Sequence, residues 1–591
     1  MEILQGLLDN LTALLAAHPL AGEWYMAFVR FLFPALAVLI LYRAVRSLLR
    51  IPHTPENWGQ LSLPNGTSLP LTHWENILGR SKTADIYLNY PSISRQHAAL
   101  CRGEDENWTL YDLGSKGGTA VNGEKVASSV PVKLGDTITL GGVPLIFLPQ
   151  TVAEREEQEA KRRAERPAAI WPSFLWLTVF QVLACLQLLV AAGTEATIAI
   201  PLAFLGLTVL MWLYYAALRA TRCVGFEMET IAFFLSTLSL SITASSAQSS
   251  LFKQFLAILL GLALFLVLGL FLRDLSRVQK NRWLMAAAAI GLLGITLVIG
   301  NSKYGAVNWI SIGGMSFQPS EIAKVAVIMY FSARLSKRNT EKPRRLSPRS
   351  PLSGVVGFLD RIGFLELVPY GLILLLIVGL MMLEPHMSGT ILILAGAAAV
   401  LFAAGIKLYW FAGGGAALMG LVVLMMSGYQ STRILVWQDP WAYPRDGGYQ
   451  IIQSLYAIGS GGLLGLGLGK SRQKFLYLPE PENDFIFAIV CEELGLIGAG
   501  IVLILFALLV MRGYWIAIHA RDRFGALLVV GITTLTAVQV FLNISVVTNL
   551  IPNTGISLPF FSYGGTALLI QLGEMGMILS ISRQIPAPKH D

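Results

Sequence analysis

The 591-residue chain has a mean hydropathy of +0.61 and only 14% charged residues, whereas a soluble protein carries about 25%. This composition excludes an ordinary soluble protein and predicts a polytopic all-α membrane protein. The formal net charge of +8 is typical of basic cytoplasmic loops, so no nucleic-acid partner is expected.

Thirteen stretches are apolar over about the 20 residues that a membrane span needs. They lie at 25–46, 170–192, 197–218, 226–247, 253–272, 283–300, 319–336, 365–383, 388–405, 408–427, 485–511, 525–547 and 564–583. Lys and Arg gather in alternate connections, and 331–361 alone holds eight of them. Because basic loops stay in the cytosol, this alternation predicts an N-terminus outside and a C-terminus inside.

Five segments follow from these patterns. They are an N-terminal segment with one transmembrane helix (1–50), a soluble cytosolic domain (65–150), a charged linker (151–169), two additional transmembrane helices (170–220) and a membrane domain (226–583). The linker is expected to form a helix that ends at Pro167. A further polar segment, 428–484, is predicted to be a large loop on the outer side.

The soluble domain has the pattern of a small all-β sandwich, since short strand-like runs alternate with Gly, Asn and Ser turns. The runs are Asp85–Leu88, Ala98–Cys101, Trp108–Tyr111, Thr137–Leu140 and Leu145–Leu148.

The order of Gly79-Arg80, Ser94-Arg95-Gln96-His97 and Asp112-Leu113-Gly114-Ser115 resembles the forkhead-associated (FHA) domain over about 80 residues. The resemblance implies that Arg80 and Ser94 contact the phosphate of a phosphothreonine, with Arg95 and Lys116 beside them. A guanidinium offers phosphate a planar fork of donors, and a hydroxyl adds a short hydrogen bond. The implied partner is a threonine-phosphorylated protein.

One position departs from the FHA pattern. The family usually has Thr-Asn-Gly-Thr where this chain has Lys116-Gly117-Gly118-Thr119, so the Asn that would hold the peptide backbone is missing. Either Lys116 supplies charge to the phosphate instead, or the domain is a scaffold with weak or no phosphopeptide binding.

In the membrane domain, ionisable residues in apolar spans are costly and indicate function. Trp309 precedes the run Pro319-Ser320-Glu321-Ile322-Ala323-Lys324, in which Glu321 and Lys324 share one helical face. The alternative is a buried structural ion pair.

The outer loop carries a second group of candidates. Arg433 begins it, and a glycine-rich stretch is followed by Lys470, Arg472 and Lys474, which suit a pyrophosphate. Asp484 lies where a helix enters the outer leaflet, a position in which a carboxylate stays ionised and available as a base.

A third group, from Asn549 to Gly565, is rich in Pro and Gly. Together the three groups resemble the SEDS family (shape, elongation, division and sporulation) of RodA/FtsW-like proteins, over about 226–583 and its ten-helix core. The resemblance implies a peptidoglycan glycosyltransferase of the bacterial cytoplasmic membrane that uses lipid II as donor and acceptor. Asp484 matches the catalytic acidic residue, most simply the general base, and Trp309, Glu321, Lys324 and Arg433 match substrate-binding positions.

A second departure from the family pattern lies at Glu384-Pro385-His386, where the family commonly has Pro-Asp-Leu-Gly-Thr. Either Glu384 or His386 would replace the Asp.

The implied protein partner is a class B penicillin-binding protein. The sequence shows no dedicated set of metal ligands, and whether a divalent cation (Mg²⁺ or Mn²⁺) takes part is left open. Two other functions also remain: a lipid II flippase, and an FHA-bearing scaffold of the cell-wall machinery.

Overall fold

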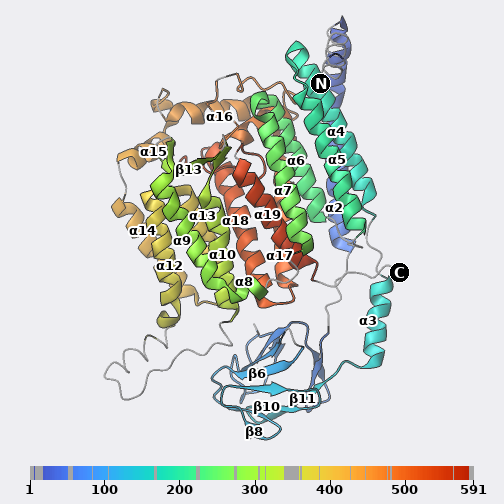
Figure 1. Cartoon of the computed structure of the whole chain (residues 1–591), viewed down its shortest axis with the longest axis vertical. Coiled ribbons are helices and arrows are strands. Elements are labelled where there is room, and N and C mark those ends of the chain that lie inside the picture. Colours follow the sequence, from blue (N-terminus) through green and yellow to red (C-terminus); the bar gives the residue numbers. More distant parts are fainter. Residues whose placement is uncertain are drawn as a thin grey trace.

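The computed structural model places a helical bundle above a small β-sandwich, with α3 (Val152–Ala164) beside the sandwich (Figure 1). It describes residues 6, 17–50, 57–82, 84–103, 106–164, 169–220, 227–271, 276–303, 306–312, 315–337, 359, 363–384, 387–425, 428–445, 447–475, 477–479, 482–563 and 565–584. We call the two ends of the bundle the sandwich side and the far side.

The sandwich consists of two sheets with strand orders β2-β1-β11-β10-β7-β8 and β4-β3-β5-β6-β9. The strands are β1 Gln60–Ser62, β2 Ser68–Pro70, β3 Glu75–Gly79, β4 Ile86–Tyr87, β5 Ala98–Arg102, β6 Trp108–Asp112, β7 Thr119–Val121, β8 Glu124–Lys125, β9 Ser129–Val132, β10 Thr137–Leu140 and β11 Val143–Leu148. Alternate side chains such as Leu78, Leu100 and Ile138 point inwards and are fully buried. The predicted all-β sandwich is confirmed.

Each of the thirteen predicted spans falls on a helix of the bundle. These helices are α2 Pro19–Arg50, α4 Trp171–Ala192, α5 Ala199–Ala220, α6 Glu227–Ser246, α7 Leu251–Phe271, α9 Arg282–Ile299, α10 Pro319–Ser336, α12 Phe364–Leu383, α13 Met387–Ala403, α14 Leu408–Met425, α17 Ile486–Ile518, α18 Arg523–Val547 and α19 Gly565–Ser582. Among the described residues, ten helices are long and apolar enough to cross a membrane. The predicted number of thirteen is therefore not confirmed.

Glycines allow close packing of α7 against α19 in the bundle. A Cβ at Gly261 would lie 2.5 Å from the Leu572 Cδ1 atom, and one at Gly576 would lie 3.0 Å from the backbone of Phe265. Small residues at helix contacts let the two backbones approach, which is how apolar helices gain packing in a membrane.

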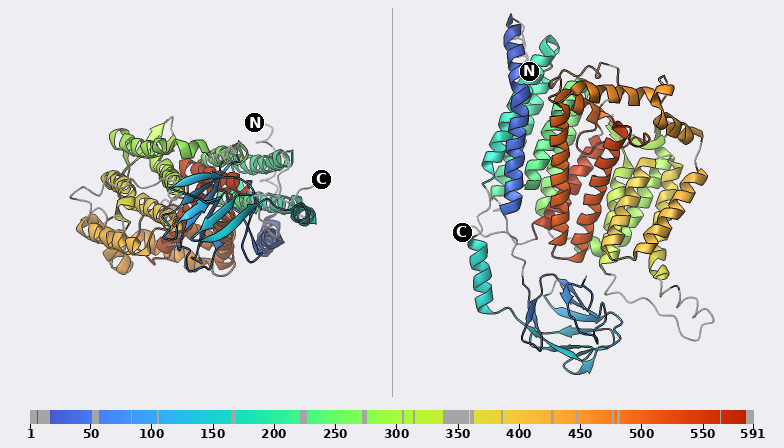
Figure 2. Two further views of the ribbon diagram at one scale, coloured as in Figure 1. Left: turned by 90° about the horizontal axis from the view of Figure 1, so that it is seen from below. Right: turned by 180° about the vertical axis from the view of Figure 1, so that it is seen from behind.

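The N-terminal helix α2 packs beside α4 and against α6 and α17 (Figure 2, right). Tyr25 donates a hydrogen bond to the Leu183 carbonyl of α4 at 2.9 Å. Near the sandwich side, the Ser47 hydroxyl donates to Glu227 at the start of α6. These contacts attach the additional helices to the rest of the bundle.

The far side is more ordered than the sequence indicates. The segment predicted as a loop contains α15 (Gly428–Gln438) and α16 (Gly448–Gly461), and α16 buries its apolar side, including Ile451, on α17. Between α9 and α10, strands β12 (Asn301–Lys303), β13 (Ala306–Ile312) and β14 (Met315–Phe317) form a small sheet that was not predicted. Short strands of this kind are fixed by pairing with each other, so periodicity alone does not identify them.

Candidate functional site

Asp484 lies directly before α17, on the far side of the bundle. Its backbone carbonyl accepts a hydrogen bond from the Asn543 side chain of α18 at 2.7 Å, and the same amide group donates to the Ile556 carbonyl at 2.7 Å. A Cβ at Gly555 would lie 3.9 Å from the Asp484 Oδ2 atom, so the backbone of the α18–α19 loop passes beside the carboxylate. Asp484 is therefore held between two helices and this loop.

Arg433 of α15 contacts the same loop. Its Nη1 atom donates to the Asn553 carbonyl at 3.0 Å, and the Asn553 side chain binds both the Gly555 N–H, at 3.0 Å, and Gln450, at 3.3 Å. Because Asn553 and Gly555 are two residues apart, they lie within about 7 Å of each other. The structure thus brings Arg433 and Asp484, two predicted site residues, to one short stretch of backbone.

Glu321 and Lys324 form an ion pair at 2.8 Å near the start of α10. Their side chains are only 8% and 2% exposed, and Glu574 of α19, also buried, interacts electrostatically with both. The pair lies inside the helix packing in this structure. Its predicted contact with substrate stays a prediction.

Trp309 is half-buried in β13 and pairs with Asn301 of β12. Strand β13 packs against α9 and α10, so Trp309 lies on the sheet that covers the helix carrying Glu321 and Lys324. Its predicted role in substrate binding likewise remains untested.

Lys474 points towards the protein interior. Its Nζ atom donates to the Gly469 carbonyl at 2.6 Å and to the Ser245 hydroxyl of α6 at 3.2 Å. Burial lowers the pKa of the Lys474 amine, while Glu493 and Glu492 oppose that shift. The Lys474 charge is thus used to hold the glycine-rich segment on α6 and α17, and its predicted binding of substrate stays a prediction.

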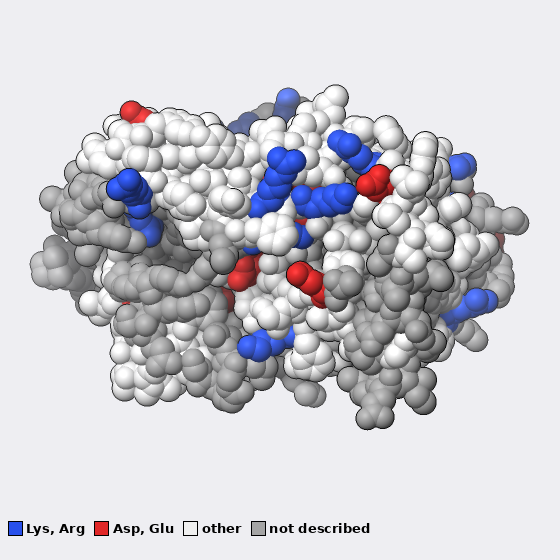
Figure 3. Space-filling view, turned by 90° about the horizontal axis from the view of Figure 1, so that it is seen from above, with Lys and Arg blue, Asp and Glu red and all other residues white. Residues whose placement is uncertain are grey.

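The acidic pair at the start of α17 fixes the same segment. Glu492 accepts hydrogen bonds from the Ser471 hydroxyl and from the Arg472 N–H, the latter at 3.0 Å, and Glu493 accepts from the Ser471 N–H at 3.1 Å. The Lys470 and Arg472 side chains are exposed. Figure 3 shows the far side, where Lys and Arg gather around a few acidic side chains near the middle of the face. Positive charge there favours an anionic ligand.

The FHA-like site lies at one end of the sandwich, where loops bring the four predicted residues to one place. The Arg80 N–H donates to the Ser94 carbonyl at 2.9 Å, and the Lys116 N–H donates to the Ser94 hydroxyl at 3.0 Å. The side chains of Arg80, Arg95 and Lys116 are exposed around Ser94. This arrangement offers three cations and a hydroxyl to one anion.

Two further side chains, the buried His97 and the half-buried Asp112, support these loops. The His97 ring accepts from the Ser94 N–H at 3.1 Å and bonds the Gly118 carbonyl at 3.0 Å through its other nitrogen. Burial lowers the pKa of His97, which favours the neutral ring that this pattern requires. Burial raises the pKa of Asp112, but hydrogen bonds from Ser115, Thr119 and Gly114 together lower it.

The departure at Gly117 has a steric reason. A Cβ at this position would lie 2.6 Å from the Ser92 carbonyl oxygen and 2.8 Å from the Gly141 Cα atom. An asparagine therefore does not fit without a shift of the backbone, and the loop is shaped around glycine.

Two residues of the site region were missed from the sequence. Asn543 holds Asp484, and Glu574 faces the Glu321–Lys324 pair. Both are polar residues inside strongly apolar spans, and this is the signal that would have identified them.

No three His, Cys, Asp or Glu residues come together as a set of metal ligands within the described ranges of the chain. A divalent cation, which the sequence neither requires nor excludes, therefore has no such set of ligands in these ranges.

Residues 226–586 match the cell cycle protein family of FtsW, RodA and SpoVE, and residues 76–141 match the FHA domain. A probable peptidoglycan glycosyltransferase FtsW from Geobacter sp. (strain M18) is 41% identical, over 49% of this chain and 74% of the relative. Stage V sporulation protein E from Bacillus subtilis (strain 168) is 42% identical, over 49% of this chain and 76% of the relative.

A solved chain described under structural coordination of polymerization and crosslinking by a peptidoglycan synthase complex is 26% identical, with a TM-score of 0.49. The alignment covers 61% of this chain and 98% of that one. The family match spans more than half of the sequence and includes Asp484, Arg433 and the Glu321–Lys324 pair. The chain therefore belongs to the FtsW/RodA/SpoVE cell cycle protein family, as a multi-pass membrane protein that also carries an FHA domain.

Proposed function

We propose that the protein is a glycosyltransferase that polymerises lipid II into glycan strands at the outer face of the bacterial cytoplasmic membrane. The observation that carries this proposal is the position of Asp484, fixed by Asn543 and lying beside the loop that Arg433 holds. The name of the Geobacter relative, a probable peptidoglycan glycosyltransferase, supports the same reaction class. The alternation of basic loops supports an outward-facing site.

Asp484 acts as the general base in this proposal. The 4-hydroxyl oxygen of the acceptor GlcNAc attacks C1 of the donor MurNAc, and its proton passes to the Asp484 carboxylate. The bond from C1 to the pyrophosphate oxygen breaks, and its electron pair leaves with undecaprenyl pyrophosphate, so C1 inverts. Arg433 and the exposed Lys470 and Arg472 supply positive charge for the departing phosphates.

The test uses purified protein and lipid II in detergent, with no other enzyme present. The expected product is a ladder of glycan strands on a gel. A second assay places the protein in sealed vesicles. If the protein is a flippase, lipid II reaches the other leaflet of the vesicle there, and no polymer forms in either assay. That result would replace the proposed reaction by transport.

Replacing Asn543 by alanine is expected to slow polymerisation about a hundredfold, because a small displacement of a catalytic group costs about that much. The substitution leaves the Asp484 carbonyl and the buried Ile556 carbonyl without the amide donor that now joins them. Thr536→Val is the matched control: Thr536 is buried on the same helix, but its hydroxyl donates only along the helix, to Ile532. Equal rates for the two variants would contradict the role of Asn543.

For the FHA domain we propose binding of a phosphothreonine on a partner protein, through Arg80, Ser94, Arg95 and Lys116. The exposed cations around the Ser94 hydroxyl support this assignment. We also propose that a class B penicillin-binding protein cross-links the strands, since the family resemblance implies such a partner and the sequence has no transpeptidase motif of its own.

A further inference from the structure

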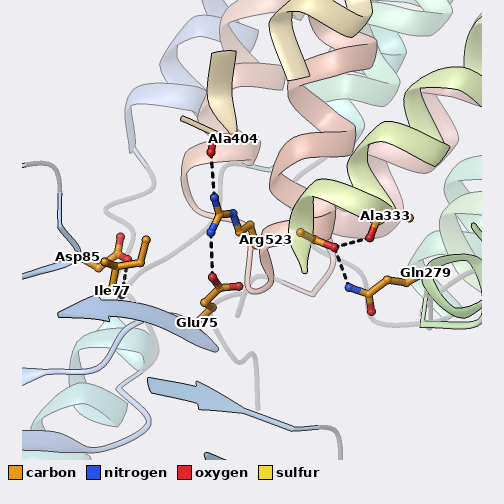
Figure 4. Close-up of polar contacts among 8 residues, drawn as sticks. Glu75, Ile77, Asp85, Gln279, Ala333, Ala404 and Arg523 are labelled. Carbon is orange, nitrogen blue, oxygen red and sulfur yellow. Dashed lines mark hydrogen bonds and ion pairs between the residues drawn. The ribbon is translucent and has the colours of Figure 1, made fainter. Parts of the chain in front are cut away.

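The end of the sandwich that lies opposite the phosphothreonine site touches the membrane domain. Glu75, the first residue of β3, forms an ion pair at 2.9 Å with Arg523, the first residue of α18. The same arginine donates to the Ala404 carbonyl at the end of α13, at 3.1 Å. Figure 4 shows Arg523 between the two partners. One guanidinium therefore joins the sandwich to two helices.

Aromatic contacts extend this interface. The Trp74 backbone N–H donates to the Arg521 carbonyl at 3.1 Å, and the Arg521 guanidinium lies 3.9 Å from the ring centre of Trp74 and 4.7 Å from that of Trp58. Arg102 of the sandwich lies 4.1 Å from the Trp58 ring. The two indoles thus contact one cation from the sandwich, Arg102, and one from the membrane domain, Arg521. Cation–π attraction stabilises both contacts.

The contact is made with the turn between α17 and α18. Helix α17 begins at Ile486, two residues after Asp484, and ends at Ile518, and α18 runs from Arg523 to Val547 and contains Asn543. The residues from 519 to 523 close this helical hairpin on the sandwich side. The Asn543–Asp484 hydrogen bond closes it on the far side, about 30 Å away along α18.

The phosphothreonine site is left open by this contact. In β3, β5 and β6 the residues at the membrane end are Glu75, Arg102 and Trp108, and the opposite ends lead to Arg80, His97 and Asp112. Five residues of strand span about 13 Å. A phosphopeptide and the hairpin therefore occupy opposite ends of the same three strands.

We infer that the FHA domain is docked on its own membrane domain, and that this docking restrains the α17–α18 hairpin that positions Asp484. Glu75, Trp58 and Trp74 form the docking surface on the domain, and Arg521 and Arg523 form the surface on the hairpin. The domain then links a phosphorylated partner at one end to the catalytic hairpin at the other. The effect on catalysis rests on the proposed function, whereas the docking itself does not.

Cys101 reports the docked state. It pairs with Glu75 across β3 and β5, and its thiol interacts electrostatically with both Glu75 and Arg523. Burial raises the pKa of this thiol, Glu75 adds to the shift, and Arg523 opposes it. Because the thiolate is the reactive form, alkylation of Cys101 is slow while the domain is docked.

The test measures alkylation of Cys101 by N-ethylmaleimide in the full-length protein, followed by mass spectrometry of the peptide. Arg523→Glu sets two acids against each other and is expected to raise the alkylation rate about tenfold. In a domain that stayed docked, this change would make the thiolate scarcer and slow the reaction, so a faster rate reports undocking. Adding Glu75→Arg reverses both charges and re-forms the ion pair, so alkylation is expected to slow again relative to Arg523→Glu; it stays somewhat faster than in wild type, because an arginine beside the thiol favours the thiolate.

Arg80→Ala, at the opposite end of the domain, is the control and is expected to leave Cys101 alkylation unchanged. Unchanged or slower alkylation in Arg523→Glu would overturn the docking. So would fast alkylation that Glu75→Arg does not slow again, because the faster rate would then not depend on the Glu75–Arg523 pair.

Polymerisation of lipid II by the same variants tests the restraint on the hairpin. The expected result is a rate that changes at least about threefold in Arg523→Glu and returns in the double variant. Restored alkylation without any change in polymerisation would refute the restraint and leave the docking intact. A wild-type protein that makes no polymer would overturn the proposed function, and the alkylation arms would still decide the docking.

Discussion

Replacing Asp484 by asparagine is expected to reduce polymerisation of lipid II by about a thousandfold, because general-base catalysis contributes about 10²- to 10⁴-fold. Asparagine has nearly the shape of aspartate but cannot accept the proton of the acceptor hydroxyl. The hydrogen bond from Asn543 goes to the backbone carbonyl of residue 484 and survives the substitution. The loss therefore concerns the chemical step and not the local fold. Glycan strand formation by the purified variant, followed over time on a gel, measures the effect.

Glu195→Gln is the matched control for this variant. Glu195 is an exposed acid in the short connection between α4 and α5, outside the region matched by the FtsW/RodA/SpoVE family. Its neutralisation removes the same charge and is expected to leave polymerisation within about twofold of wild type. A polymerisation rate for Asp484→Asn that equals this control would remove Asp484 from the role of base.

Replacing Arg80 by alanine is expected to weaken binding of a phosphothreonine peptide about thirtyfold to a hundredfold, since a hydrogen bond to a charged group contributes about 1.5–3 kcal/mol. Arg80 is exposed beside Ser94, so its removal leaves the core of the sandwich unchanged. Calorimetry with phosphorylated and unphosphorylated forms of one peptide measures the affinity. Peptides drawn from a phosphorylated lysate supply the candidates.

Lys133→Ala is the corresponding control, because Lys133 is exposed after β9, at the end of the sandwich away from Arg80. It is expected to bind the peptide as wild type does. If wild-type protein does not distinguish the two peptides, the FHA domain is a scaffold, the alternative that the missing Asn at Gly117 left open.

The Glu321–Lys324 pair shows what the spacing of residues along a helix predicts about a site and what it does not. Residues three apart on a helix meet, so the ion pair itself was predictable. Its burial beneath α19, with Glu574 nearby, depends on which face of α10 packs inward. Lys474 is a similar case, since a cation in a polar loop is expected outside but here reaches Ser245 on a distant helix.

The sequence by itself determined the helical spans, the β-sandwich and the order of the candidate residues along the chain. These properties follow from local composition: a span needs only apolar length, and a strand needs only alternation between turns. The loops of the proposed phosphothreonine site also belong to this group, because Arg80, Ser94 and Lys116 are joined by short connections within one small domain.

Only the tertiary structure decided which distant residues meet. Asn543 and Asp484 are separated by 59 positions, and Arg523 and Glu75 by 448, yet each pair forms a direct contact. Such contacts depend on the rotation and depth of whole helices, which are set by the summed packing of many apolar side chains and not by the residues that finally touch. For that reason the position of the proposed base, and the docking of the FHA domain on the hairpin beside it, emerged only from the folded chain.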